Sequence, residues 1–308
     1  MKNNFYIIIL LTFGITQDII GENLYLDDLI EYIQDNYTTN SVLSYDNARD
    51  KMYGIIDNNN GTVKCVYTDY SVNNVPQNNP RPTVHDGGLD CEHVWPQSMY
   101  AGSSPMKSDM HHLRPSKSNV NSSRGNNPFN EIIDSQVNHW YWLDFDFSNI
   151  PSNNIDEFSE SKSNAFEPRE TVKGDIARSM YYFYTIYHNV VNENFFQLQK
   201  DVLYQWHIQD PPDNEEINRT WAIASYQNNI PNPFILDSSL IYRCYYYEFL
   251  LGDANLDNSV NVVDVVLLVG IILGQIEISD NQFIYADIDN NSLINVSDIV
   301  SLIEIILS

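Results

Sequence analysis

The stretch CEHVWPQSMY, residues 91–100, places a carboxylate and an imidazole side by side at Glu92 and His93. A second polar stretch, SDMHHLRPSKSNVNSSRGNNPF, follows at residues 108–129. Adjacent side chains on a strand point to opposite faces of the strand. If residues 91–93 form a strand, the acid and the base therefore serve separate roles on its two sides.

Oxygen donors dominate this part of the chain. Glu92 offers a carboxylate, and Asn121 and Asn126 offer amide oxygens. Without a cysteine cluster, such a set suits Mg²⁺ or Ca²⁺. A zinc site would need three protein ligands with nitrogen or sulfur among them. His111 and His112 are adjacent rather than spaced i, i+4, which disfavours a zinc protease.

One hard cation, one histidine base and nearby arginines together describe phosphodiester hydrolysis. A neutral imidazole at His93 can take a proton from water near neutral pH. A divalent cation can neutralise charge that develops on the phosphate and on the leaving oxygen. Taken alone, the Glu92–His93 pair fits a structural role as well, and the isolated histidines are interpreted as core or surface residues: His139, His188 and His207.

Six blocks in order carry a resemblance to the endonuclease I family. They are EHVWPQS, SDMHHLRPS, VNSSRGNNPF, VKGDIARSMYYFYTIY, DPPDNEEINRT and NNIPNPF, within residues 44–247. The resemblance implies an α+β fold, mostly helical around a ββα-metal (His-Me) finger. It also implies an exported enzyme that cuts DNA, and often RNA, with little sequence preference and leaves 5′-phosphates.

The resemblance also implies roles for individual residues. Glu92 and Asn121 would hold Mg²⁺ (or Mn²⁺ or Ca²⁺), and His93 would be the general base. Asp109, His111 and Asn126 would support the finger by contacting the residues that hold the metal or act on the substrate, without touching either themselves.

The family's phosphate-stabilising arginine has no obvious counterpart. In some members it lies in an insertion after the E-H-x-x-P block, but here that stretch, MYAGSSPMKS at residues 99–108, contains no arginine. Arg124, Arg114 or Lys107 is then expected to take its place.

The net charge of the chain is unusual for a nuclease. Sixteen Lys and Arg against 41 Asp and Glu give −25, whereas residues 81–130 carry five basic and four acidic side chains, a net +1. Because affinity for DNA comes largely from basic contacts to phosphate, we expect weak, salt-sensitive and non-specific binding.

Residues 1–21 read as a signal peptide, with Lys2 before an apolar run at residues 5–15. The run is too short for a membrane anchor, since a spanning helix needs about 20 residues. We therefore expect a secreted, extracellular protein with no transmembrane segment after signal cleavage. Of three cysteines, Cys65 and Cys91 are the preferred disulfide pair; the alternative is three buried free thiols, including Cys244.

Periodicity predicts helices over residues 24–36, 44–56 and 172–188, and a helix, proline break and helix over residues 202–227. Residues 62–70 alternate as a strand, and residues 71–90 read as loop. From Glu248 onward the chain has ten acidic residues and no Lys or Arg. This shift divides the chain into a nuclease-like domain, residues 22–249, and a small domain, residues 250–308.

The small domain contains two loops, DANLDNSVNVVD and DIDNNSLINVSD, offset by 34 residues. Their spacing matches EF-hand ligands, with Asp in place of Glu at position 12 and a backbone carbonyl expected at position 7. Each loop leads into an apolar helix, residues 265–274 and 299–308, and no entering helix is obvious. The expected calcium ligands are Asp253, Asn255, Asp257, Ser259, Asn261, Asp264, Asp287, Asp289, Asn291, Leu293, Asn295 and Asp298.

This small all-α domain of two loop–helix repeats resembles a type I dockerin. The resemblance implies two bound Ca²⁺ ions and a cohesin-like protein partner, and with it attachment to a cell surface. The alternative is a pair of Asx-rich turns without metal. For the whole chain, the alternative to a nuclease is a non-catalytic nucleic-acid-binding or assembly protein attached through this tail.

Overall fold

The computed structural model describes residues 19–248 and 250–308, which form two compact units. The apolar run of the expected signal peptide lies outside these residues. Of these residues, the N-terminal unit comprises 19–22 and 27–241, and the C-terminal unit comprises 23–26, 242–248 and 250–308. Within the described residues, no helix combines the length and the apolar composition that a bilayer span requires.

The division between the units falls at Tyr242 rather than at the expected residue 250. Two tyrosines explain the difference. The ring of Tyr247 packs on Tyr25, with centroids 4.0 Å apart, and its hydroxyl donates to the Leu256 carbonyl over 3.0 Å. These contacts tie residues on both sides of position 250 to the same unit.

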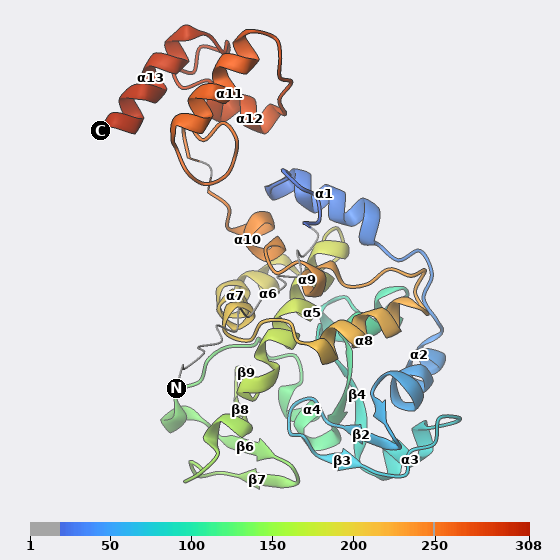
Figure 1. Ribbon diagram of the computed structural model, residues 1–308. Coiled ribbons are helices and arrows are strands. Elements are labelled where there is room, and N and C mark those ends of the chain that lie inside the picture. Colours follow the sequence, from blue (N-terminus) through green and yellow to red (C-terminus); the bar gives the residue numbers. More distant parts are fainter. Residues whose placement is uncertain (1–18, 249) are drawn as a thin grey trace, which may run out of the picture. The chain divides into compact units, whose positions relative to one another are not determined.

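The N-terminal unit is built mostly from helices around short antiparallel strands (Figure 1). Its helices are α1 (Leu26–Tyr37), α2 (Tyr45–Lys51), α3 (Arg81–Asp86), α4 (Ser118–Arg124), α5 (Lys173–Ile186), α6 (Glu193–Gln197), α7 (Lys200–Gln209), α8 (Asn214–Ala224) and α9 (Pro233–Leu236), with α10 (Leu240–Tyr245) at the division between the units. Mixed helix and strand content is therefore confirmed.

Three antiparallel sheets accompany these helices. One has the order β1-β2-β3 (Asn58–Asn59, Thr62–Lys64, Ser71–Val72). The second pairs β4 (Leu89–His93) with β5 (Leu113–Lys117). The third has the order β7-β6-β8-β9, formed by Phe145–Phe147, His139–Trp142, Ser159–Lys162 and Ala165–Glu167.

Most expected helices are confirmed with small shifts at their ends. The helix at residues 44–56 is α2, capped by the Ser44 hydroxyl and continued by a π-helical turn, Met52–Ile56. The proline break separates α7 from α8 as expected.

Two expectations for residues 62–90 are wrong. The strand expected to reach residue 70 ends at Lys64, because Cys65 closes a turn: its amide donates to the Tyr70 carbonyl and its carbonyl accepts from Asp69. Asp69 adopts φ 58°, which interrupts a strand. The stretch expected to be loop contains β3 and α3.

Helix α5 lies in the interior of the N-terminal unit and anchors the segment between β4 and β5 (Figure 1). Phe183 on this helix stacks on Trp95, with centroids 5.1 Å apart and planes 16° from parallel. The same ring lies 4.4 Å from that of His112. Aromatic packing of this kind holds the polar β4–β5 segment in one conformation.

The C-terminal unit consists of α11 (Val262–Ile272), α12 (Asp280–Ala286) and α13 (Val296–Leu307) around a core of Ala254, Leu268, Ala286 and Leu302. Helices α11 and α13 begin three residues before the expected starts, because Asn261 and Asn295 cap them. Helix α12 leads into the second loop, so the expectation of no entering helix is wrong there.

Candidate active site

Strand β4 ends on Glu92 and His93, and their side chains have different surroundings. Glu92 contacts Tyr67 and Arg124. His93 contacts the Lys107 carbonyl and the Gln97 amide, which Glu92 does not. This is the divergence expected of neighbouring residues on a strand. In the pairing of β4 with β5, Glu92 lies opposite Arg114 and His93 opposite Leu113.

Glu92 is 2% exposed and is held by two neighbours. The Tyr67 hydroxyl donates to Oε1 over 2.8 Å, and Arg124 Nε lies 3.3 Å from the same oxygen. Neither contact engages Oε2. Burial raises the pKa of Glu92 to about 7, although Arg124 and the Tyr67 hydrogen bond act to lower it. An added positive charge would favour the ionised form of this carboxylate.

Asn121 comes from α4, which follows β5 directly and packs against β4 and β5. Two antiparallel strands followed by a helix form the ββα arrangement that the resemblance implies. The Asn121 side chain is half-buried and makes no hydrogen bond to another residue that the structure describes. Asn126 lies exposed beyond the end of α4. A carboxylate and a free amide oxygen are a donor set that fits Mg²⁺, Mn²⁺ or Ca²⁺.

Arg124 is fully buried, and its Nε lies near Glu92 without a hydrogen bond. Besides its ion pair with Glu92, Nη2 donates to the Val94 carbonyl over 2.6 Å and Nη1 donates to the Gly125 carbonyl over 2.8 Å. Its guanidinium also lies over the Phe129 ring. In this position Arg124 fixes Glu92 and joins α4 to the chain after β4, and it has no face open to a phosphate.

Arg114, the other arginine considered for the phosphate, is 7% exposed. Its Nη2 lies 3.2 Å from Asp175 Oδ2 on α5. Burial lowers the pKa of this arginine, and Arg219 adds to the effect. Its surroundings are therefore those of an interior ion pair between β5 and α5.

The hydrogen bonds of His93 show which ring nitrogen carries the proton when the imidazole is neutral. Nε2 lies 3.0 Å from the Lys107 carbonyl, which can only accept, so Nε2 carries the proton. Nδ1 then accepts from the Gln97 side-chain amide over 3.2 Å. Burial lowers the pKa of His93 to about 3, and neighbouring His112 acts in the same direction. The imidazole is neutral at pH 7, with Nδ1 as its basic atom.

Asp109 is a hub of hydrogen bonds in the segment between β4 and β5. Its Oδ1 accepts from the His111 amide and Gln227, and its Oδ2 accepts from the Tyr182 and Tyr187 hydroxyls. Burial acts to raise its pKa, but the electrostatic effects of His111 and His112, with the hydrogen bonds from Gln227 and Tyr187, outweigh burial and the pKa is lowered.

His111 is buried as well, and its Nε2 lies 3.0 Å from the Ile230 carbonyl. Burial lowers the pKa of its imidazole. Neither His111 nor Asp109 contacts Glu92 or His93 directly. Both instead fix the chain that carries the Lys107 carbonyl, which lies two residues before Asp109.

All three cysteines are free thiols, so the expected Cys65–Cys91 disulfide is wrong. The reason is that β5 lies between the two residues. Pro115 pairs with Cys91 in the register, while its carbonyl accepts from the Val66 amide on the other side. Strands lie about 4.8 Å apart, so two strand spacings exceed the roughly 7 Å that a disulfide can span between Cα atoms.

Several residues of the site are absent from the sequence-based set. Tyr67 holds Glu92 from 25 positions away, and no motif around it indicates this contact. Gln97 is different, because it directly follows the E-H-x-x-P block. Tyr45 on α2 packs on His93, with ring centroids 5.4 Å apart. Only the fold brings α2 to the end of β4.

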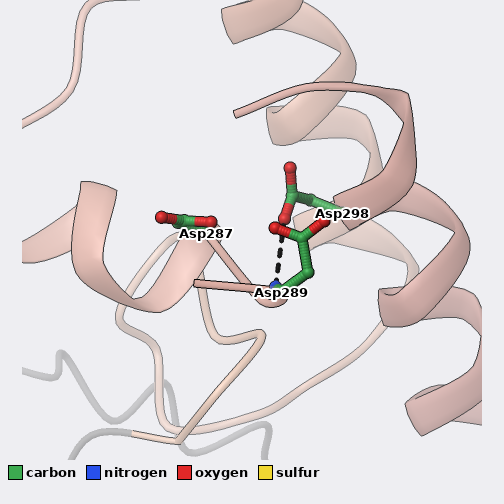
Figure 2. A group of neighbouring side chains, drawn as sticks. All are labelled: Asp287, Asp289 and Asp298. Atoms are coloured by element: carbon green, nitrogen blue, oxygen red, sulfur yellow. Dashed lines mark hydrogen bonds between the residues drawn. The ribbon is translucent and has the colours of Figure 1, made fainter. Parts of the chain in front are cut away.

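The C-terminal unit contains the other candidate metal site. Asp287, Asp289 and Asp298 converge from the end of α12, the following turn and the first turn of α13 (Figure 2). Their ligand oxygens all lie within 4.8 Å of one another. The Asp298 carboxylate also accepts from the Ile288, Asp289 and Asn295 amides.

The first loop repeats this pattern 34 residues earlier. Asp253 accepts from the amides of Asp257 and Asn258, as Asp287 does from those of Asn291 and Ser292. Asn258 and Ser292 both adopt φ 66° at position 6, where EF-hand loops carry glycine. The two loops therefore share one backbone design.

Comparisons with known proteins agree on one family. A family model described as Endonuclease I matches residues 21–239. Two relatives, each named "Extracellular ribonuclease", come from Bacillus subtilis (strain 168) and Bacillus amyloliquefaciens, and are 32% and 31% identical over 170 residues. Each alignment covers 48% of this chain and 51% of the relative. The chain thus spans about half the length of the curated relatives it matches.

Proposed function

Because the chain belongs to the endonuclease I family, we propose that it is a metal-dependent nuclease that hydrolyses phosphodiester bonds in DNA or RNA. The observation that supports this most is the ββα unit formed by β4, β5 and α4. It sets Glu92 and His93 on opposite sides of one strand and Asn121 on the helix that packs against that strand. The names of the two relatives make RNA a substrate to test beside DNA.

In the proposed reaction, His93 acts as the general base. Nδ1 takes a proton from a water molecule, while the Lys107 carbonyl keeps Nε2 protonated and the ring oriented. The water oxygen bonds to phosphorus and the bond from phosphorus to O3′ breaks with its electron pair on O3′. A solvent water protonates O3′, the other product carries a 5′-phosphate, and His93 returns its proton to solvent. The Gln97 amide must leave Nδ1 for water to approach, which its exposed side chain permits.

Glu92 and Asn121 are the residues that would hold the divalent cation. When bound, Mg²⁺ (or Mn²⁺ or Ca²⁺) would supply positive charge beside the phosphate and the leaving oxygen. Arg124 would act on this site indirectly, because its ion pair fixes the Glu92 carboxylate. We assign Asp109, His111 and Asn126 to the surroundings of the site rather than to contact with substrate.

We further propose that the C-terminal unit binds two Ca²⁺ ions and docks the enzyme onto a cohesin-like protein. The repeated loop hydrogen bonds support the calcium sites. Exposed apolar side chains support docking, because they recur at the same 34-residue offset along α11 with its C-cap Leu273 and along α13: Val262 and Val296, Val266 and Val300, Leu273 and Leu307. A secreted enzyme attached to a cell surface is consistent with this arrangement.

The decisive experiment compares cleavage of plasmid DNA and of RNA in Mg²⁺ and in EDTA, for the wild-type protein and for His93→Ala. The proposed function requires cleavage by wild type in Mg²⁺ only, with most of it lost in the variant. Binding of nucleic acid without cleavage under all conditions would instead favour the alternative, a non-catalytic nucleic-acid-binding or assembly protein.

A further inference from the structure

The site needs a cation to meet the substrate's phosphate, and the two arginines of the finger are not placed to do so. Arg124 is fully buried, with Nη1 and Nη2 donating to backbone carbonyls and Nε 3.3 Å from the Glu92 carboxylate. Arg114 is 7% exposed and pairs with Asp175. Turning Arg124 toward solvent would leave the buried Glu92 carboxylate without its ion-pair partner, which is costly. Turning Arg114 would break its ion pair with Asp175. The phosphate contact must therefore come from elsewhere.

Two other cations lie beside the catalytic histidine, and both rest on one aromatic ring. The guanidinium carbon of Arg49 lies 4.3 Å from the centroid of the Tyr45 ring, and Lys107 Nζ lies 5.0 Å from it. That ring is 5.4 Å from the imidazole of His93. Lys107 is also joined to His93 through its own carbonyl.

These cations are available to an anionic ligand. All three side chains of the Arg49–Tyr45–Lys107 cluster are half-buried, so they reach the surface. Among the residues that the structure describes, no carboxylate lies within ion-pair distance of Lys107. Arg49 pairs with Asp46, which is 62% exposed. Exposed ion pairs contribute little free energy, so a phosphate can replace Asp46 at small cost.

We propose that Lys107 and Arg49, held on the Tyr45 ring, are the cations that contact the phosphates of a nucleic-acid strand at the His93 site. This inference rests on the proposed function. Lys107 is nearest to the general base and would meet the scissile phosphate, while Arg49 would meet a neighbouring one. The Tyr45 ring limits the motion of both side chains through cation–π contacts, which reduces the entropy lost on binding.

The test measures how binding depends on salt. Lys107→Met and Arg49→Met are made in the His93→Ala background, so that the strand is bound but not cut. Fluorescence anisotropy with a labelled oligonucleotide gives the affinity across a series of salt concentrations. Loss of one phosphate contact should lower the slope of log affinity against log salt by about 0.7 for a single strand or about 0.9 for a duplex.

Lys51→Met is the matched control. Lys51 belongs to the same helix as Arg49 and also lies over a tyrosine, but that tyrosine is Tyr226. The control should keep the full salt slope. Lys107→Arg should keep it too, which separates loss of charge from loss of folding; thermal unfolding of each variant is measured alongside.

The outcomes separate this inference from the proposed function. If wild type cleaves but Lys107→Met and Arg49→Met bind with the slope of Lys51→Met, the cation assignment is wrong and the nuclease proposal stands. If wild type does not cleave, but the salt slope falls in Lys107→Met and Arg49→Met and not in Lys51→Met, the phosphate contacts are supported and the nuclease proposal is wrong. Cleavage by wild type together with both reduced slopes supports both.

Discussion

Two regions of this chain bring acidic side chains to a place where we propose a cation, and they treat the charge differently. At the end of β4, a single carboxylate, Glu92, is buried against Arg124 and the Tyr67 hydroxyl. In the second C-terminal loop, three aspartates lie within 4.8 Å, and backbone amides are their main donors. From Glu248 to the end of the sequence there is no Lys or Arg.

The difference indicates which role a cation would have at Glu92 and which role it would have in the C-terminal loop. Protein groups already hold Glu92 in place, so a cation there is needed for chemistry rather than for folding. The three aspartates repel one another, and a bound cation would offset that repulsion more strongly than the backbone amides do. We therefore expect the N-terminal unit to keep its fold without metal, and the C-terminal unit to depend on metal for its fold.

The largest expected effect is on chemistry alone. His93→Ala removes the basic Nδ1 and should lower the cleavage rate by about 10²–10⁴-fold. Binding of oligonucleotide should remain, since His93 carries no charge at pH 7. His139→Ala is the control, because His139 is exposed and pairs only with Asp146 at the surface. Near-normal turnover by His93→Ala in single-turnover assays would assign the base elsewhere.

The next effect separates the two proposed metal ligands. Glu92→Ala leaves the buried Arg124 without its partner and should lower the free energy of unfolding by about 3–5 kcal/mol. Asn121→Ala removes only a half-buried amide and should raise the Mg²⁺ concentration needed for activity while leaving thermal unfolding unchanged. Denaturant titration and Mg²⁺ titration of both variants test this. An unchanged Mg²⁺ midpoint in Asn121→Ala would mean that Asn121 is no ligand.

The third effect concerns the loops. Calcium at 100 times its dissociation constant should stabilise the C-terminal unit by about 2.7 kcal/mol per site. Calorimetry of the full chain should therefore show two unfolding transitions. A calcium-selective chelator should lower the temperature of one transition and leave the other unchanged. Asp298→Asn should reduce the change in unfolding temperature that calcium causes, whereas Glu304→Gln, on the exposed face of the same helix, should leave that change intact. A profile insensitive to calcium would leave the loops as metal-free turns.

How much the sequence predicts differs between the same two regions. In the loops, ligand candidates and the groups they bond lie within 12 residues, so spacing alone predicts their geometry. At β4, the adjacent pair Glu92–His93 and the position of Asn121 are equally local. The partners that decide their chemistry are not local, because Tyr67, Tyr45 and the Lys107 carbonyl reach the site only through the tertiary fold.

The same reason explains the errors. Arg124 and Arg114 are conspicuous cations near the motif, but their burial depends on the contacts of Phe129 and Asp175. The sequence also shows Cys65 and Cys91 leading into the same segment. It does not show that β5 passes between them.

The smallest expected effect per pH unit tests whether burial keeps one carboxyl group of the N-terminal unit protonated at neutral pH. Glu160 on β8 is 7% exposed, and its Oε2 has no hydrogen-bond partner among the described residues. Burial, with neighbouring Glu167, raises its pKa from 4.5 to about 8.

The folded protein thus binds the Glu160 proton more tightly than the unfolded chain does. Its contribution to stability is complete below pH 4.5 and is lost as the pH rises through about 8. Glu160→Gln, which stays neutral, should therefore gain about 1.4 kcal/mol over wild type for each pH unit between pH 5 and pH 8. Urea unfolding at both pH values measures the difference, with Glu215→Gln, at an exposed position of α8, as the control. Parallel pH profiles for Glu160→Gln and wild type would show that Glu160 ionises normally in the folded protein.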